Sequence, residues 1–413
     1  MDYTAKDLEI LRPLAGAYAE FALADRCRRI ENEYRKLNSL NRVRPPVLVF
    51  EVPWGELDKQ EPLVLQCEGV RARKLENDLR MALYQKKHFL GDYVVPPYYP
   101  IYKAYSSTSK GVEVSETTID STTGSSIQSH AYADVLRDEE DLAKFKIPVY
   151  SLREEETAAE EDFVRRVFDG LMPTRRIGHQ FYFASWDEIP RYHGVENTLI
   201  DLYDRPEFMH ACMEFFTQMH ESQIDQFEKL GLLEAESYYL HCTPALVENQ
   251  PLPDENGNYK AKDVWCRAMA QLFGSVSPEM HEEFDLQYTQ RLFDRCRQSY
   301  YGCCEPLHNK IDHLRRFKNL RRISVTPWAD PDIAADNIGS DYVMSCKPNP
   351  AFVAGSTFDP EPVRKEIRRY MTAAKRNNTP CEFIIKDIST VSCNVDNLTQ
   401  WVKTVNETID EFD

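Results

Sequence analysis

The stretch RRISVTPWADPDIAADNIGSDYVMSCK, Arg321–Lys347, carries the pattern that decides the fold. It contains two strand-like runs, RRISVTPW and DYVMSCK. Between them lies ADPDIAADNIG, a run that predicts a helix closing on a glycine. A strand, a helix and a second strand in this order form a unit whose two strands run parallel with a right-handed crossover. The stretch therefore predicts an α/β fold built on a parallel sheet.

The same alternation continues on both sides of this unit. The other expected strands lie at 47–52, 236–242, 269–273, 299–303 and 381–387, and the helices between and after them at 277–298, 305–317, 359–377 and 394–412. Seven or eight strand–helix units over this length fit a (β/α)8 TIM barrel. The sequence has no glycine-rich phosphate loop of the dinucleotide or Walker type, so a Rossmann fold is less favoured.

The N-terminal part differs from this alternation. Residues 5–40 have good helix formers and apolar residues at helical spacing, and Pro13 predicts a break into two helices. We therefore expect an N-terminal helical extension over 1–45 and the barrel over 46–413. Around 105–130 the composition shifts to Ser and Thr with few large apolar residues. This stretch predicts an exposed insertion in the barrel, such as a hairpin.

The composition restricts the class of partner. The 413-residue chain has a net charge of −17, and phosphate binding needs a basic face, so we expect no nucleic-acid partner. No window approaches the ~20 apolar residues of a membrane span, and the start, MDYTAKDLEILRPLAG, lacks a signal-peptide pattern. We therefore expect a cytoplasmic protein whose 11 cysteines are reduced thiols, a subset of them available for metal binding. The sequence is also compatible with a homodimer.

Polar residues follow the expected strands, at the ends where a barrel carries its active face. The strand at 299–303 leads into Cys303, Cys304 and Glu305, and the strand at 381–387 ends in Lys386 and Asp387. The other residues found at or after strand ends are Glu51, Trp54, His241, Cys242, Trp328, Asp330, Lys347, Asn349 and Cys393.

Each of these residues also has an ordinary structural explanation. Successive strand residues face opposite sides, so only one of Cys303 and Cys304 can point into the mouth of the barrel, and the other packs in the core. A histidine such as His241 is commonly a hydrogen-bonded wall residue. Lysines at strand ends, such as Lys347 and Lys386, pair with carboxylates or bind anions.

Thiols on separate strands suggest a zinc site. Zinc binds Cys, His and carboxylate ligands, and a catalytic site uses three of them and keeps one position open. Under this hypothesis Cys303 and Cys393 supply two thiolates, and Glu305 or His241 supplies the third ligand. The open position would bind and activate a heteroatom of the substrate.

Three segments resemble the uroporphyrinogen decarboxylase superfamily, in the branch related to corrinoid-dependent methyltransferases. The segment SPEMHEEFDLQYTQRLFDRC with the following YYGCCEPLHNKID is similar to the family's Ser-Pro-initiated helix and the strand that carries a metal-binding His-X-Cys-Gly. HGVENTLIDLYDRPEFMHACMEFF resembles the helix pair around Gly-x-Glu-Asn and Pro-Glu, and CNVDNLTQWVKTVNE lies where the methyltransferases place a later cysteine ligand. The resemblance is clear over 160–413 and looser over 1–100.

The resemblance implies a methyltransferase-like enzyme that moves a methyl group between a small methylated substrate and a corrinoid carried by a separate protein. Cys303 and Cys393 take the family's cysteine positions, whereas Tyr301 stands where the methyltransferases have a histidine. Cys303, Cys393 and Glu305 are then the metal-ligand candidates. The catalytic candidates are Glu305, Lys386 and Asp387, and the substrate-binding candidates are Glu51, Trp54, His241, Trp328, Asp330, Lys347 and Asn349.

Two other functions remain open at this point. The first is a metal-independent lyase or decarboxylase, in which Lys347 and Lys386 bind a carboxylate and Glu305 or Asp387 transfers protons. The second is a non-catalytic barrel that binds a metabolite or a corrinoid. Decarboxylation of uroporphyrinogen itself is not expected, because RPPVLVFEVPWGEL lacks the arginine pair with which those enzymes grip propionates.

Overall fold

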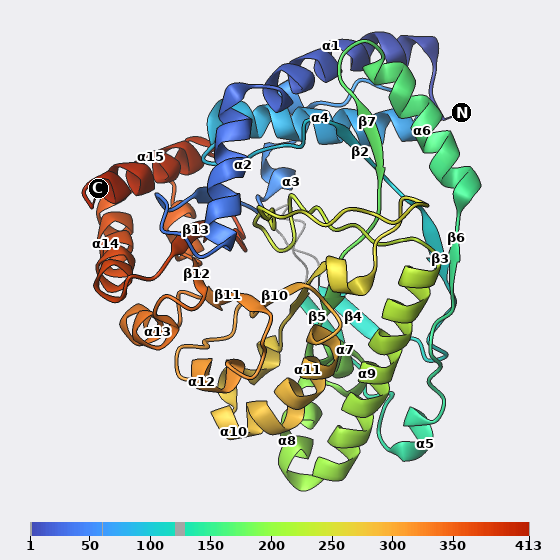
Figure 1. Cartoon of the computed structure of the whole chain (residues 1–413), viewed down its shortest axis with the longest axis vertical. Coiled ribbons are helices and arrows are strands. Elements are labelled where there is room, and N and C mark those ends of the chain that lie inside the picture. The colour runs from blue at the N-terminus through green and yellow to red at the C-terminus, as the bar shows by residue number, and fades with distance from the viewer. Residues whose placement is uncertain (1, 60, 120–128, 413) are drawn as a thin grey trace.

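A seven-stranded sheet forms the centre of the computed structural model, which describes residues 2–59, 61–119 and 129–412 (Figure 1). In spatial order the strands are β1 (Val47–Val49), β13 (Cys381–Ile385), β12 (Val343–Cys346), β11 (Leu320–Val325), β10 (Gln298–Tyr301), β9 (Trp265–Ala268) and β8 (Phe181–Phe183). Every neighbouring pair is parallel. The predicted α/β fold with a parallel sheet is therefore confirmed.

The first and last strands of the chain's alternating part lie next to each other, because β1 pairs with β13. At the other edge, β8 follows β7 (Thr174–Ile177), and β7 pairs in parallel with β2 (Tyr99–Tyr102) in a separate two-stranded sheet. Within the described ranges no strand pairing joins β8 to β1. The pairings thus form a seven-stranded parallel sheet, and they do not include the closure of an eight-stranded ring.

Helices surround this sheet, and an N-terminal group covers one end of the molecule (Figure 1). The helices are α1 (Ala5–Ala22), α2 (Asp25–Asn38), α3 (Trp54–Leu57), α4 (Val70–His88), α5 (Glu139–Leu142), α6 (Glu154–Phe168), α7 (Ser185–His193), α8 (Val195–Asp204), α9 (Pro206–Lys229), α10 (Pro278–His281), α11 (Gln287–Phe293), α12 (Ile311–Leu314), α13 (Pro331–Ile338), α14 (Pro360–Asn377) and α15 (Asp396–Asp410). The predicted helices at 359–377 and 394–412 are confirmed as α14 and α15. The Ser277 cap that begins α10 is also confirmed, since its side chain accepts a hydrogen bond from the backbone of Met280.

Helix α1 runs through Pro13, so the predicted break at this proline is wrong. The chain instead leaves the helical conformation after α1 and begins α2 at Asp25. A proline inside a helix removes one hydrogen bond and costs about 3 kcal/mol. The buried face of α1, which includes Leu11 and Tyr18, packs in a hydrophobic cluster with Leu75 of α4 and offsets that cost.

Three further predictions of secondary structure are wrong. Residues 236–242 form an irregular loop with bends in place of a strand, and the N–H of Leu240 donates to the carbonyl of Thr243 (3.0 Å). The strand expected at 269–273 lies earlier, at β9, and Gln271–Ser275 is a 3-10 helix. Only α12 is α-helical within 305–317. Apolar runs this short do not distinguish strands from buried turns.

The two faces of the sheet differ in chemistry, because successive side chains on a strand point to opposite faces. One face carries apolar residues such as Ile323, Met344 and Phe383, which belong to the largest hydrophobic cluster together with Trp401 of α15. On the other face, strand register aligns a polar set: Tyr182, Arg267, Tyr300, Arg322, Ser345 and Glu382. We call this second face the polar face.

The predicted insertion leaves the sheet and forms two antiparallel pairs. Strand β3 (Tyr105–Ser107) pairs with β6 (Tyr150–Leu152), and β4 (Glu116–Ile119) pairs with β5 (Ser129–Tyr132). The expected hairpin is confirmed at β4 and β5, while 120–128 lie outside the described residues.

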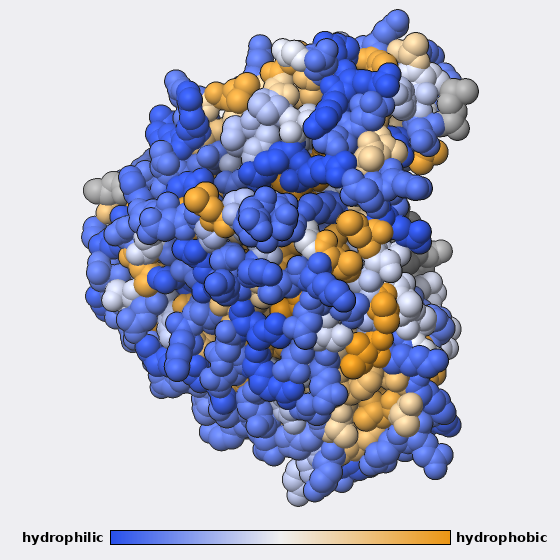
Figure 2. All heavy atoms as spheres, turned by 45° about the vertical axis from the view of Figure 1, so that its right-hand side comes forward, coloured by the Kyte–Doolittle hydropathy of each residue, from blue (hydrophilic) through white to orange (hydrophobic). Residues whose placement is uncertain are grey.

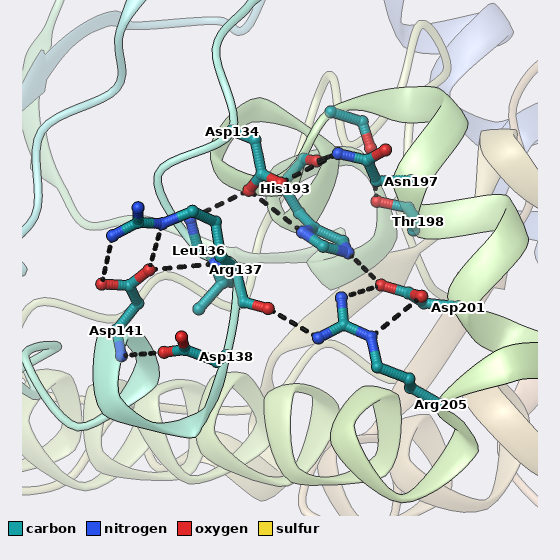
Figure 3. Close-up of polar contacts among 11 residues, drawn as sticks. Asp134, Leu136, Arg137, Asp138, Asp141, His193, Asn197, Thr198, Asp201 and Arg205 are labelled. Atoms are coloured by element: carbon teal, nitrogen blue, oxygen red, sulfur yellow. Dashed lines mark hydrogen bonds and ion pairs between the residues drawn. The ribbon is translucent and has the colours of Figure 1, made fainter.

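A polar network fastens the segment after this hairpin to α7 and α8 (Figure 3). The ring of His193 is buried between Asp134 Oδ1 (3.2 Å) and Asp201 Oδ2 (2.7 Å). Arg205 binds the same Asp201 and donates to the carbonyl of Arg137 (2.6 Å). Because both ring nitrogens of His193 have carboxylate partners, the network has a structural role and holds the insertion against the helices.

The surface in the view of Figure 2 is mainly hydrophilic, with hydrophobic residues gathered toward the right-hand side. Large apolar residues that remain exposed include Val149, Val195 and Leu252. Among the described helices, none combines the length and the apolar character that a membrane crossing needs.

Candidate active site

The polar face is built in layers along the strands, and its deepest layer is an ion pair. Arg322 on β11 and Glu382 on β13 lie 2.5 Å apart, and both side chains are 0% exposed. Thr243 donates to Glu382 Oε2 (2.7 Å) and accepts from Arg322 Nη1 (2.8 Å). Burial acts to raise the pKa of Glu382, but Arg322 and Lys347 hold it below its ordinary value. The ionised pair therefore anchors the loop 236–247 across the polar face.

The next layer is a chain of hydrogen bonds that ends on this ion pair. Ser345 donates to Glu382 Oε1 (2.6 Å) and accepts from the Lys347 ammonium (2.7 Å) and the Tyr300 hydroxyl (3.1 Å). The ammonium of Lys347 also lies 5.5 Å from the centre of the Tyr300 ring. Lys347 is 3% exposed, so the structure places this predicted substrate-binding residue inside the polar face.

The outer layer, at the carboxyl ends of the strands, centres on Cys303 and Lys386. The ammonium of Lys386 donates to Cys303 Sγ (3.3 Å). A hydrogen bond with Cys304, whose sulfur lies 3.5 Å away, and the charge of Lys386 lower the pKa of the Cys303 thiol. Burial acts to lower the pKa of Lys386, but the Cys303 thiolate and the surrounding acidic groups raise it. The contacts with Cys304 and Lys386 therefore favour the thiolate form of Cys303 more than water would.

Two carboxylates complete the outer layer. Lys386 Nζ lies 3.2 Å from Asp387 Oδ2 and 3.4 Å from Glu51 Oε2. Both acidic residues have positive φ angles, 49° for Glu51 and 54° for Asp387, which turn the chain at the ends of their strands. Burial and a hydrogen bond shared with Asp387 raise the pKa of Glu51, whereas the pKa of Asp387 is lowered. The sequence placed Lys386 and Asp387 at the end of one strand and Glu51 at the end of another, and the structure brings the three side chains together.

Glu305 lies behind this layer and is enclosed by backbone. Its carboxylate accepts from the N–H groups of Cys303 (2.9 Å) and Ala270 (3.1 Å), and it is 1% exposed. Burial raises the pKa of Glu305 to about 7, even though these N–H groups oppose the shift. Glu305 thus fixes the backbone that presents Cys303, and it can hold or release a proton near neutral pH.

The turn before Cys303 depends on Gly302. This glycine has a φ of 97°, and a Cβ atom there would lie 2.5 Å from Leu307 Cδ1. The turn separates Cys303 on the polar side from Tyr301, which points to the apolar face. Tyr301 is fully buried and donates to Asp285 (2.6 Å).

The predicted zinc ligands are held in different surroundings. Cys303 contacts Lys386, Glu305 is occupied by backbone N–H groups, and Cys393 is an exposed loop residue whose own N–H donates to Glu56 (3.1 Å). Over the residues that the structure describes, no three His, Cys, Asp or Glu side chains are placed to hold one metal ion. The donor set of Cys303, Cys393 and Glu305 thus does not fit zinc in this arrangement.

The remaining predicted site residues are Trp54, Asp330, Asn349 and Trp328, and each makes different contacts. Trp54 packs against Tyr84 and Phe89. Asp330 caps α13 by accepting from Ile333 (3.2 Å), and Asn349 accepts from the N–H of Ala351 (3.0 Å). Trp328 is 71% exposed directly after β11. Of these four, the indole of Trp328 is the side chain left open to solvent at a strand end.

Sequence reasoning identified His241 and missed its neighbours Arg267 and Tyr182. The guanidinium of Arg267 hydrogen-bonds His241 Nδ1 and lies 4.0 Å from the centre of the Tyr182 ring. All three side chains belong to the polar face or to the loop that crosses it. The available signal was an arginine within the apolar strand WCRA, a placement that requires a polar surrounding.

Comparison with known proteins finds likeness to solved structures. No protein-family model matches the chain, and no curated protein matches it by sequence. A methyltransferase from Methanosarcina mazei has a similar fold, with a TM-score of 0.50 and 8% sequence identity. The likeness covers 93% of this chain and 98% of that chain. At this identity it shows a shared fold over nearly the full length.

Proposed function

We propose that this chain is a methyltransferase-like enzyme of the uroporphyrinogen decarboxylase superfamily, folded as a (β/α)8 barrel. It would move a methyl group between a small methylated substrate and a corrinoid bound to a separate protein. Support comes from the resemblance of its motifs and from the full-length likeness to a solved methyltransferase. The pairing of β1 with β13 also agrees with a barrel, in which the first and last strands are neighbours.

The observation that carries this proposal is the buried ammonium of Lys386 at the carboxyl ends of the strands. It is 4% exposed and lies between Cys303, Glu51 and Asp387. A fixed cation at this place stabilises negative charge that develops on a reacting atom, more strongly than water would. Active sites of barrel enzymes lie at this end of the strands.

Methyl transfer supplies such developing charge. The methyl carbon leaves without the bonding electrons, and the heteroatom of the substrate keeps the pair. When bound, the corrinoid of the partner protein supplies the electron pair that forms the new bond to the methyl carbon. Lys386 would lie against the heteroatom and stabilise the charge it gains, while Cys303 keeps Lys386 ionised and oriented. The raised pKa of Lys386 favours this electrostatic role over proton donation.

Zinc takes no part in this mechanism. Of the three ligands expected from the sequence, Cys303 contacts Lys386, Glu305 accepts from backbone N–H groups, and Cys393 lies on an exposed loop. The Lys386 ammonium is instead the cation that accompanies the Cys303 thiolate.

The proposal is tested by mixing the protein with cob(I)alamin and a set of small O-, N- and S-methyl compounds. Formation of methylcob(III)alamin is followed by its absorbance. We expect turnover with at least one compound, and a loss of at least about 100-fold for Lys386→Met, since removal of one preorganised charge costs about 10²–10³ in rate. Lys375→Met is the matched control, because Lys375 is exposed and its ammonium contacts only Phe412, through the carbonyl and the ring, among the described residues. Full activity of Lys386→Met would overturn the proposal.

A second candidate is a metal-independent lyase or decarboxylase, which the raised pKa of Glu305, about 7, favours. A group with this pKa exchanges protons near neutral pH, as general acid–base catalysis requires. Release of carbon dioxide from small carboxylic acids, abolished by Glu305→Gln and without methyl transfer, would select this candidate.

A further inference from the structure

Two cations of the polar face, Arg267 and Lys347, have no carboxylate partner. Arg267 is hydrogen-bonded to His241 and stacked on Tyr182, and it forms no ion pair with any described residue. Lys347 donates to the neutral hydroxyl of Ser345 (2.7 Å) and likewise has no ion pair in the described part of the chain. Buried charges are normally paired, because leaving water without a counter-charge is costly.

The buried carboxylate of Glu382 forms no ion pair with either cation among the described residues, although the charge of Lys347 helps to lower its pKa. Glu382 is bound by Arg322, Ser345 and Thr243, which occupy both of its oxygens. Glu51 and Asp387 are engaged with Lys386 in the outer layer. Among the described residues, Arg267 and Lys347 therefore have no counter-charge in direct contact.

His241 adds an unsatisfied donor at the same place. Its ring is buried, and the burial and the charges of Arg267, Lys386 and Lys347 lower its pKa, so the ring is neutral. Arg267 donates to Nδ1, which leaves the ring proton on Nε2. Nε2 is buried and has no hydrogen-bond partner among the residues that the structure describes. A buried donor without an acceptor costs about 1–3 kcal/mol.

We infer that Arg267, Lys347 and Nε2 of His241 bind a carboxylate group of the substrate. Every free polar group in this set is a donor, and the planar guanidinium fork of Arg267 matches the two oxygens of a carboxylate. Arg267 is only partly buried, so a ligand can reach it from the solvent. The inference rests on the proposed function in placing the methylated end of the same substrate against Lys386.

The net charge of the molecule disfavours a polyanionic substrate. With a net charge of −17, the chain repels polyanions at a distance, and a single carboxylate meets the least repulsion. The substrate class is thus a small carboxylic acid that carries a methyl group on O, N or S.

The test is isothermal titration of the full chain with methoxyacetate, with its neutral isostere methoxyacetamide and with inorganic phosphate, in a buffer free of carboxylates and phosphate. We expect methoxyacetate to bind, and the amide and phosphate to bind at least about tenfold more weakly. The Arg267→Gln and Lys347→Met variants should bind methoxyacetate about tenfold or more weakly than the wild type. Arg267→Lys should retain part of the affinity, which separates loss of charge from loss of folding. Arg368→Gln is the matched control, since Arg368 pairs with Glu411 (2.7 Å) on α14 and α15.

Equal binding of the acid and the amide, or unchanged binding of methoxyacetate by folded Arg267→Gln, would overturn the inference. Tighter binding of phosphate than of methoxyacetate would also overturn it, in favour of a phosphate ligand. Binding needs no turnover, so Arg267-dependent binding without methyl transfer would support the carboxylate site while refuting the proposed function.

Discussion

Breaking the buried ion pair beneath the site should destabilise the whole protein. Glu382→Gln removes the negative charge beside Arg322, and both side chains are 0% exposed. The amide keeps acceptor capacity for Ser345, so we expect the loss to lie at the lower end of the 3–5 kcal/mol typical of broken buried pairs, about 3 kcal/mol. This corresponds to a change of roughly 150-fold in the unfolding equilibrium.

The assay is urea unfolding followed by circular dichroism at pH 7, with Glu411→Gln as the control. Glu411 pairs with Arg368 at the surface, where solvent screens the charges, so its replacement should leave the unfolding curve nearly unchanged. The pKa of Glu382 is lowered, so its stabilising contribution is present at neutral pH and is lost on acidification. A loss below about 1 kcal/mol for Glu382→Gln would refute the layered description of the polar face.

Three further predictions concern the groups around the site. Lys386→Met should raise the pKa of Cys303 and slow its alkylation by iodoacetamide at pH 7, measured by mass spectrometry; an unchanged rate would contradict the contact between them. The pKa of Glu305 is raised from 4.5 to about 7. Between these pH values the folded state binds a proton that the unfolded state has lost. The free energy of unfolding should therefore fall by about 3 kcal/mol as the pH rises from 4.5 to 7. Glu305→Gln should remove this slope in urea titrations between pH 4.5 and 7, and a retained slope would assign it to another group. Elemental analysis should find zinc well below one ion per chain, and one zinc per chain that is lost in Cys393→Ala would contradict the separation of the predicted ligands.

Much of the C-terminal fold could be predicted because its elements have clear boundaries. The glycine at 339 ends α13, and prolines at 331 and 360 begin α13 and α14. Residues 236–242 were mistaken for a strand because their apolar side chains fill the interior while His241 contacts Arg267. A sequence gives no sign that such a run crosses a sheet instead of joining it.

The candidate site was predicted in part for a similar reason. Cys303, Lys386, Asp387 and Glu51 follow directly from the rule that parallel strands end at one edge. Arg267 lies inside its strand, so this rule does not select it. Cys393 also follows a strand, but it lies on a loop where its thiol is exposed and its backbone N–H donates to Glu56.

The most direct test of the account follows a labelled methyl group through the site. Methoxyacetate with a ¹³C-labelled methyl group is incubated with the protein and cob(I)alamin, and the label is observed by NMR. The account predicts a cobalt-bound ¹³C-methyl resonance for the wild type and its absence for Lys386→Met. A label that stays on methoxyacetate in the wild type, although the titration shows that this acid binds through Arg267, would contradict the assignment of methyl transfer to this site.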